Sequence, residues 1–268
     1  MDNEALRAVA TQVATEAAEL ARTIRDESVT GGAVRTKSTE TDVVTAADKA
    51  AERLVRDRLA ELRPGESVLG EEEGGAGALE GLRWVVDPID GTVNYLYGYP
   101  WYAVSLAAQV DGTSVAGAVV EPVSGRVWSA AAGGGATLDG APLRVSGSGR
   151  LDLALVGTGF AYDVDRRRAQ AVATGKLLGQ VRDIRRSGAA SLDLCAVAAG
   201  WLDAYYEVGL NRWDWAAGAL IAQEAGAHLR LPETGAADGM GEQAMLCATP
   251  DIAVPLAEVL GAAGAWEV

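Results

Sequence analysis

Residues 83–107 read RWVVDPIDGTVNYLYGYPWYAVSLA, where an apolar run leads directly into two aspartates, Asp87 and Asp90. Only a proline and an isoleucine separate the two acids. Charges at the end of a buried strand cost free energy unless a partner compensates them. The stretch is therefore either an ordinary turn or a binding site.

A metal ion is one partner that compensates such charges. Mg²⁺ prefers oxygen ligands, usually one or two carboxylates together with water and substrate phosphate. Because Pro88 fixes one φ angle and keeps a helix from starting early, Asp87, the Ile89 carbonyl and Asp90 can converge beyond the strand. Taken alone, however, an Asp-Pro-x-Asp-Gly string is more often a plain turn or a helix cap.

Further acids at expected strand ends and helix starts favour the site. Alone, the acidic string GEEEGG would be a solvated loop, and the acid in RWDWAAG would cap its helix. Their joint occurrence with the flanking residues instead predicts a shared cation site. These acids are Asp48, Glu71, Glu72 and Asp214.

The residues after the aspartates suit a phosphate group. Gly91 and Thr92 begin an expected helix, and the unpaired N–H groups of a first helical turn form an anion site. The chain has 23 Lys and Arg against 37 Asp and Glu, a net charge of −14, which argues against nucleic acid or an anionic membrane as a partner. Bound cations would reverse the local sign and allow such a protein to bind phosphate.

The first half of the chain shows two amphipathic helices followed by antiparallel strands. Apolar residues at steps of three and four predict helices over 4–27 and 45–62, the second opening with Thr45 and Asp48 at capping-box spacing. A strand is expected at 83–86, followed by a turn at DPIDGT. Further strands are expected at 102–110 and 114–122, joined by an Asp-Gly turn, with another hairpin at 125–143.

The second half has a different texture. From about residue 151, short apolar strands alternate with helical patterns, which predicts an α/β half with some parallel pairing. The string SGSGR marks a connector between the halves. We therefore expect two lobes: residues 1–147, an α+β lobe with the metal site, and residues 148–268, an α/β lobe that completes the metal and substrate site.

Other chemistries find little support in the residues. The single histidine, His228, cannot form a His-based metal triad, and we predict a structural role for it in a strand. P-loop and dinucleotide-binding signatures are absent. Cys195 is expected to be a small buried hydrophobe, and two cysteines give no disulfide framework. Because the sequence shows no signal peptide and no membrane-spanning run, we expect a cytoplasmic protein with no membrane partner.

The motifs GEE at 70–72, WVVDPIDGTVNYLYGYP at 84–100 and WDWAAGALIAQEAGA at 213–227 together resemble the inositol monophosphatase family of metal-dependent, lithium-sensitive phosphatases. TDVVTAAD at 41–48 is similar to the family's N-terminal aspartate segment, and RRSGAASLDLCAVAAGWLDAYYEVG at 185–209 to its substrate-side segment. The resemblance covers nearly the whole chain, in the family's order. It implies an α/β (α+β) fold, a layered αβαβα sandwich of the inositol monophosphatase and fructose-1,6-bisphosphatase type, assembled as a homodimer.

The resemblance also implies metal ligands. Glu71, Asp87 and the Ile89 carbonyl would hold one Mg²⁺, and Asp87, Asp90 and Asp214 would hold a second. Some members of the family use a third, weaker ion. The cofactor expected from the resemblance is therefore two or three Mg²⁺ ions.

The remaining site residues carry over in the same way. Thr92 with Asp48 would orient and deprotonate the attacking water, with Glu71 in support and Thr45 positioning Asp48. Gly91 and Thr92 would bind the phosphate. The residues implied to contact the substrate are Asp90, Ala190 and Glu207, with Lys37 similar to a mobile lysine near the site.

The implied reaction is Mg²⁺-dependent hydrolysis of myo-inositol monophosphate, a small phosphorylated metabolite, to inositol and phosphate. Relatives with nearly the same metal motif hydrolyse fructose 1,6-bisphosphate, histidinol phosphate or 3′-phosphoadenosine phosphates, and these substrates stay open. Asn211 and Arg212 depart from many members and leave substrate preference open. A non-catalytic binding or regulatory protein on the same scaffold is the alternative from another class, although it would not need the full set of acids.

Overall fold

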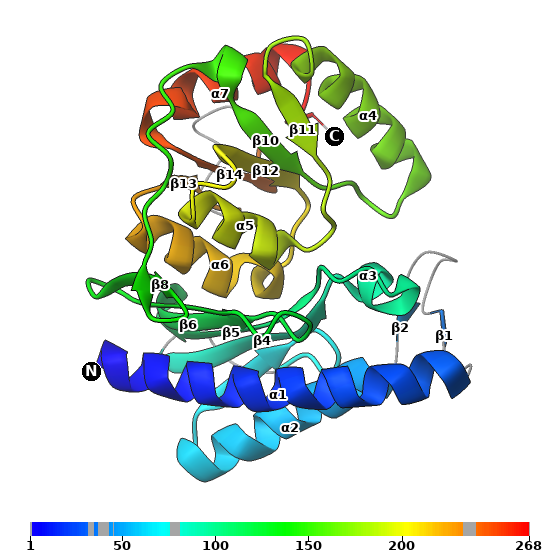
Figure 1. Ribbon diagram of the computed structural model, residues 1–268, viewed down its shortest axis with the longest axis vertical. Coiled ribbons are helices and arrows are strands. Elements are labelled where there is room, and N and C mark those ends of the chain that lie inside the picture. Colours follow the sequence, from blue (N-terminus) through cyan, green and yellow to red (C-terminus); the bar gives the residue numbers. More distant parts are fainter. Residues whose placement is uncertain are drawn as a thin grey trace.

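The computed structural model describes residues 2–31, 35–36, 43–44, 46–75, 81–232 and 240–267. Its elements stack in five layers, which Figure 1 shows from bottom to top as helices, sheet, helices, sheet and helices. This is the αβαβα sandwich that the family resemblance implied. The described part of the N-terminal region also contains a small antiparallel pair of strands, β1 (Arg35–Thr36) and β2 (Val43–Val44).

The first sheet contains, within the described ranges, seven strands that follow one another in chain order. Strands β3 and β4 are parallel, whereas the later neighbours are antiparallel. The predicted strands at 102–110 and 114–122 are confirmed, and the turn between them uses the positive φ angles of Asp111 (50°) and Gly112 (80°). The strands are β3 (Ser67–Gly70), β4 (Leu82–Asp90), β5 (Ala103–Val110), β6 (Thr113–Val120), β7 (Val127–Ala131), β8 (Gly135–Leu138) and β9 (Ala141–Pro142).

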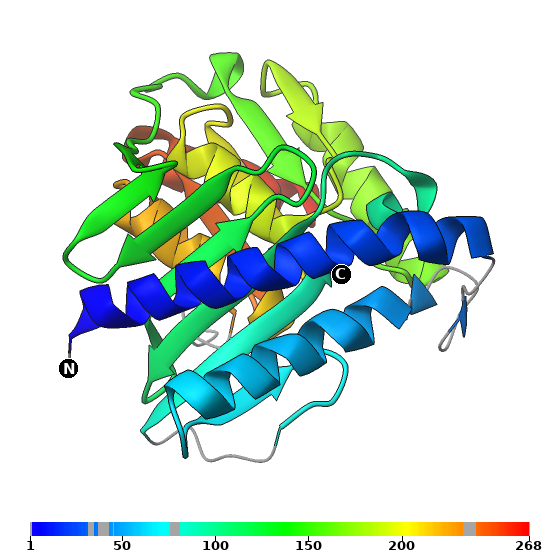
Figure 2. The same cartoon turned by 60° about the horizontal axis from the view of Figure 1, so that its bottom comes forward.

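Two long helices cover the outer face of this sheet. Helix α1 (Asn3–Gly31) and helix α2 (Ala46–Leu62) lie side by side across the strands (Figure 2). Helix α1 buries Leu6, Val13 and Ala17 against the sheet, and full burial of a leucine or valine stabilises a fold by about 1.5–3 kcal/mol. The predicted helix over 4–27 is thus confirmed and extends to Gly31.

The second sheet mixes parallel and antiparallel neighbours, in the order β11-β10-β12-β14-β13. Strand β10 is parallel to both β11 and β12, as the alternation of strands and helices predicted. Helices α4 (Val164–Leu177) and α7 (Pro250–Ala263) cover the outer face of the sheet, and the short 3₁₀ helix η1 (Leu151–Leu153) leads into it (Figure 1). The strands are β10 (Leu155–Thr158), β11 (Asp183–Arg185), β12 (Ala204–Val208), β13 (His228–Arg230) and β14 (Ala244–Ala248).

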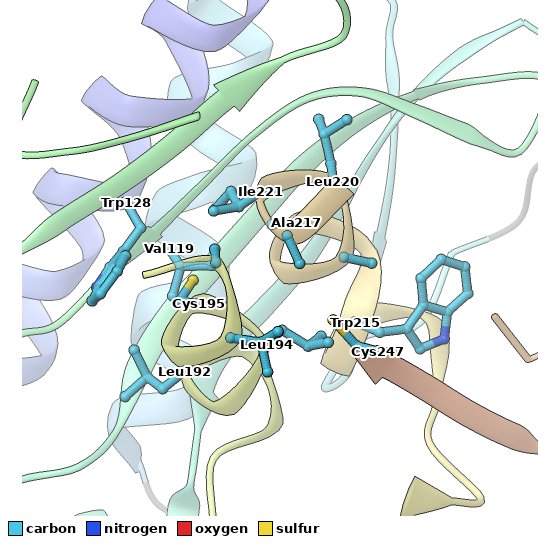
Figure 3. Packing of buried hydrophobic residues seen from close by; sticks show 14 of the residues in the cluster. Val119, Trp128, Leu192, Leu194, Cys195, Trp215, Ala217, Leu220, Ile221 and Cys247 are labelled. Carbon is cyan, nitrogen blue, oxygen red and sulfur yellow. The ribbon is translucent and has the colours of Figure 1, made fainter. Parts of the chain in front are cut away.

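Helices α5 (Ala190–Ala198) and α6 (Arg212–Glu224) form the middle layer between the two sheets. Figure 3 shows how this layer packs: Trp128 comes from the first sheet, Ile221 from α6, and Cys247 from the second sheet. Cys195 is fully buried here as a free thiol, as predicted. The middle layer contacts both sheets, so the two halves of the chain share one packed interior. The division into lobes between residues 147 and 148 stays a prediction.

Candidate active site

The two aspartates of DPIDGT lie on one strand, not in the turn that the sequence suggested. Strand β4 continues through Asp87 and Pro88 to Asp90. Asp87 pairs with Ser105 and Asp90 with Ala103, so β4 places one extra residue opposite β5. Such a β-bulge leaves a residue outside the regular ladder, where a proline is tolerated. The sequence prediction of a strand ending at residue 86 is therefore wrong by four residues.

The bulge also explains how the two acids face one site. Residues three apart on a regular strand point to opposite faces, but one extra residue restores the same face. Asp87 is 2% exposed and Asp90 is 7% exposed. The backbone N–H of Ile89 donates to Asp87 Oδ1 at 3.0 Å, which fixes the first carboxylate within the bulge.

Helix α3 (Thr92–Tyr97) begins directly after the bulge, as predicted. Gly91 has φ of 92°, and a Cβ atom there would lie 3.2 Å from the carbonyl oxygens of both Gly188 and Trp101. Only glycine adopts this backbone without strain. The Thr92 hydroxyl donates to the Ile89 carbonyl at 3.1 Å, so two predicted functional groups are in direct contact.

Three other segments bring carboxylates to the same place. The parallel register pairs Gly70 with Val86, which puts Glu71 beside Asp87. Asp48 lies in the first turn of α2 and is 1% exposed. Asp214 lies in the first turn of α6, where it accepts the Asn211 N–H at 2.6 Å and so also serves as a cap.

The acids affect one another electrostatically. Burial raises the pKa of Asp87 well above its usual range, and the nearby carboxylates of Glu71, Asp90, Asp214 and Asp48 raise it further. Burial likewise raises the pKa of Asp214, with further contributions from Asp90 and Glu71. Like charges within a few ångströms produce such shifts. The four segments therefore form one buried anionic cluster.

A cleft of about 360 Å³ opens over this cluster. Its walls include Gly91, Thr92 and the segment from Thr158 to Asp163, together with Glu207 on β12. The size is that of a small-molecule site, and both halves of the chain contribute to it. His228 is exposed on β13 and is not part of the lining.

The carboxylate cluster has the chemistry of a site for hard divalent cations. Such ions take oxygen ligands, and a cation would compensate the burial and the mutual repulsion that raise the pKa values of these carboxyls. Within the described ranges, no three His, Cys, Asp or Glu side chains are already placed to enclose a metal ion. Backbone N–H groups instead occupy carboxylate oxygens of Asp87, Asp90 and Asp214.

One family accounts for the whole arrangement. Residues 2–262 match the inositol monophosphatase family. The chain belongs to this family. It is a family of metal-dependent phosphatases, so the chain is a phosphatase whose substrate is a small phosphorylated compound.

Similar members are known from several bacteria. Inositol-1-monophosphatase of Mycobacterium leprae is 54% identical over 97% of this chain and 94% of that protein. Inositol-1-monophosphatase SuhB of Mycobacterium tuberculosis is 51% identical over 97% of this chain and 95% of that protein. A solved structure of Mycobacterium tuberculosis SuhB has a TM-score of 0.82 at 46% identity and covers 97% of each chain. The Nus factor SuhB of Pseudomonas aeruginosa is 44% identical over 69% of this chain and 70% of that protein.

The substrate-side residues suggested by the inositol monophosphatase resemblance also lie in the cleft. Ala190 and Glu207 line it, and the Ala190 N–H donates to Asp90 Oδ1 at 3.2 Å. Burial raises the pKa of Glu207 to about 7, opposed by the Tyr205 hydroxyl bonded to it and by Arg186. Lys37 and Thr45 lie outside the described residues.

The structure adds residues that sequence reasoning did not single out. Arg186 and Arg166 line the cleft and lower the pKa of Glu207. Asp193, on α5, lines it as well. Arg186 had a signal in the sequence. It lies in the string RRSG, where two adjacent cations open the segment that resembles the inositol monophosphatase substrate side.

None of the helices in the described ranges combines the length and the apolarity needed to cross a bilayer.

Proposed function

We propose that the protein hydrolyses myo-inositol monophosphate to inositol and phosphate in a Mg²⁺-dependent reaction. One observation carries the proposal: carboxylates from α2, the end of β3, the bulge of β4 and the start of α6 meet in a single buried cluster under a cleft. Phosphate-ester hydrolysis is very slow without a catalyst, and the catalyst must supply on the order of 20 kcal/mol. Concentrated cationic charge at the phosphoryl group provides much of this stabilisation.

The proposed ligands divide between two ions. Glu71, Asp87 and the Ile89 carbonyl would hold one ion. Asp87, Asp90 and Asp214 would hold the other. A third, weaker ion would bind near Glu71. When bound, such ions polarise the phosphoryl oxygens, lower the pKa of water and stabilise the leaving oxygen. Hard oxygen ligands favour Mg²⁺ over softer transition metals.

The chain's own groups orient the water and take its proton. We assign Thr92 and Asp48 to this step, with Glu71 in support and Thr45 positioning Asp48. Water attacks phosphorus opposite the leaving oxygen, its proton passes by way of Thr92 to Asp48, the bond from phosphorus to the inositol oxygen breaks, and the leaving oxygen takes up a proton from solvent water. The Thr92 hydroxyl lies 3.1 Å from the Ile89 carbonyl, a proposed metal ligand, which supports a place for Thr92 beside the ions.

The other parts of the cleft would bind the substrate. Gly91 and Thr92 would contact the phosphate, while Asp90, the Ala190 backbone and Glu207 would contact ring hydroxyls. The location of all five residues in the cleft lining supports these roles. Lys37 is proposed as a further contact from the resemblance alone.

A substrate panel with phosphate release as the readout tests the proposal. The panel contains inositol 1-phosphate, fructose 1,6-bisphosphate, histidinol phosphate and 3′-phosphoadenosine phosphate, each with Mg²⁺ and with a chelator. We expect turnover of inositol 1-phosphate only with Mg²⁺, and inhibition by lithium in the same assay. Preference for histidinol phosphate with negligible inositol phosphate turnover would reject the first choice of substrate.

A regulatory role is the second candidate. A relative at 44% identity is named Nus factor SuhB, and this name supports a regulatory role. A purely regulatory protein, however, has no need for a complete carboxylate cluster. Activity in the panel decides between the two. A homodimer and a cytoplasmic location stay predictions, and sedimentation of the purified chain measures the first.

A further inference from the structure

We propose that Glu52 is a positioning residue for Glu71: its buried carboxylate fixes the turn at 71–73 and thereby sets the affinity of the site for a divalent cation. The inference rests on the proposed function. Glu52 lies outside the cleft lining and has no role in the reaction described above.

The carboxylate of Glu52 binds the turn that contains Glu71. Oε2 of Glu52 accepts the backbone N–H of Glu72 at 2.8 Å, and Oε1 accepts the N–H of Glu73 at 3.1 Å. Hydrogen bonds to a charged acceptor are stronger than neutral ones. The two residues that follow Glu71 are therefore held by one side chain.

Arg56 makes this buried charge tolerable. Glu52 is fully buried, and the Arg56 guanidinium donates to its Oε1 from Nε at 3.0 Å and from a terminal nitrogen at 2.7 Å. The same guanidinium donates to the carbonyls of Val68 (3.2 Å) and Gly74 (2.6 Å), on either side of the turn. A buried carboxylate that is paired and fully hydrogen-bonded avoids the large cost of an isolated charge.

Gly70 leaves the space that this contact needs. A Cβ atom at Gly70 would lie 2.2 Å from Glu52 Oε1, closer than any side chain tolerates. The Gly70 N–H also donates to the Gly74 carbonyl at 3.1 Å, which closes the turn. Any residue other than glycine would displace the carboxylate.

The turn at 71–73 determines where the Glu71 side chain lies. Strand β3 ends at Gly70 opposite Val86, so the path of the chain after Gly70 determines how Glu71 approaches Asp87. Glu71 is close enough to raise the pKa of Asp87. Residues four apart share a helix face, so α2 presents Asp48 to the cluster and Glu52 to the turn.

Metal affinity distinguishes positioning from mere stabilisation. In Glu52→Gln, one acceptor becomes an NH₂ group that faces N–H donors, so the turn loses at least one of its bonds. Partners that orient metal ligands typically contribute 10–100-fold in affinity. We expect about a tenfold weaker Kd for Mn²⁺ or Mg²⁺ by calorimetry, with kcat largely recovered at saturating metal, and faster hydrogen exchange at the amides of Glu72 and Glu73.

Glu66→Gln is the matched control. Glu66 lies in the connection between α2 and β3 and accepts the Trp84 indole N–H at 2.7 Å, but no hydrogen bond joins it to the turn at 71–73. This variant should lower the Tm and leave metal affinity unchanged. Wild-type metal affinity in a folded Glu52→Gln protein overturns the inference, while a wild-type protein that binds no divalent cation overturns the proposed function as well.

Arg56→Lys keeps the inference testable if Glu52→Gln does not fold. Lysine retains the charge but loses the guanidinium fork that joins Glu52 to the carbonyls flanking the turn. We expect a smaller loss of metal affinity in the same direction and faster exchange at the same two amides. Unchanged affinity in this variant, with a Tm shift alone, also overturns the inference.

Discussion

Ser191 donates two hydrogen bonds to Asp90 across 101 positions of sequence, from its backbone N–H at 2.7 Å and from its hydroxyl at 2.5 Å. The contact joins the bulge of β4 to the first turn of α5. Burial raises the pKa of Asp90 to about 6, and these bonds oppose the rise. Burial and hydrogen bonding thus act in opposite directions on the pKa of Asp90.

This balance predicts how stability depends on pH when no divalent cation is present. The pKa of Asp90 is raised from 3.8 to about 6 and that of Glu207 from 4.5 to about 7. A raised folded pKa contributes stability that is fully present below the unfolded pKa and is lost as pH rises through the folded value. The chelator-treated protein should therefore lose stability between about pH 4 and pH 7, by about 3 kcal/mol for Asp90 alone at 1.36 kcal/mol per unit.

Urea midpoints at pH 5.5 and pH 8 check this. With chelator, the midpoint should be lower at pH 8, and excess Mg²⁺ should raise the pH 8 midpoint more than the pH 5.5 midpoint, because bound cations compensate ionised acids. Equal midpoints at both pH values in chelator would contradict the raised pKa values.

Asp87→Asn should separate stability from function. Removing one charge from the centre of the cluster relieves repulsion with Glu71 and Asp214, so the chelator-treated variant should be more stable than the wild type by roughly 1–3 kcal/mol. Metal binding should be lost and activity should fall roughly 100-fold or more, about 2.7 kcal/mol in the barrier.

The control is Asp139→Asn, in an exposed turn where the carboxylate accepts the Val127 N–H at 2.8 Å. It should change neither metal binding nor turnover. Unchanged turnover in Asp87→Asn would remove the two-metal proposal, while loss of activity in both variants would point to general instability.

The sequence predicted much of this architecture because its signals are local. The strands at β5 and β6, the Asp111–Gly112 turn and the helices α1 and α2 follow from apolar periodicity and turn residues. The acids of the cluster stood out because charges at strand ends are costly. The order of strands in the second sheet depends on packing over long sequence separations and was not predicted.

The bulge of β4 could not be found from sequence for the same reason. Whether Asp87 and Asp90 face the same side depends on their partners Ser105 and Ala103, which lie beyond α3. Glu52 gave no signal either, because a glutamate within an amphipathic helix is usually solvated, and only the fold reveals the turn that it binds. Arg166 likewise resembles an ordinary surface charge until the fold brings the first turn of α4 to the cleft.

Gly159→Ala should impair substrate binding without affecting metal. Gly159 lines the cleft, and a Cβ atom there would lie 1.9 Å from Glu207 Oε2. The glutamate must move, so we expect KM to rise about tenfold, near 1.4 kcal/mol, with an unchanged metal Kd. The control is Gly175→Ala on α4, where a Cβ atom meets nothing within 4 Å and should add up to about 1 kcal/mol of stability. An unchanged KM in Gly159→Ala would exclude Glu207 from the substrate contacts.

Asp193→Asn should stabilise the protein at pH 8. Asp193 is 2% exposed, its Oδ1 has no hydrogen-bond partner, and burial raises its pKa well above the usual range, opposed by a hydrogen bond from Ser187. A buried ionised oxygen without a partner is costly, so the amide should gain about 1 kcal/mol in chelator, a gain that shrinks as pH falls and Asp193 becomes protonated.

Asp203→Asn provides the opposite case in the same half of the chain. The Asp203 carboxylate accepts the Leu155 N–H at 2.8 Å and the Ser146 hydroxyl, so an NH₂ group there would face a donor, at a cost of about 1–3 kcal/mol. Urea unfolding of both variants at pH 5.5 and pH 8 compares them. If Asp193→Asn destabilises the protein as strongly as Asp203→Asn at pH 8, the expected cost of the ionised Asp193 carboxylate is contradicted.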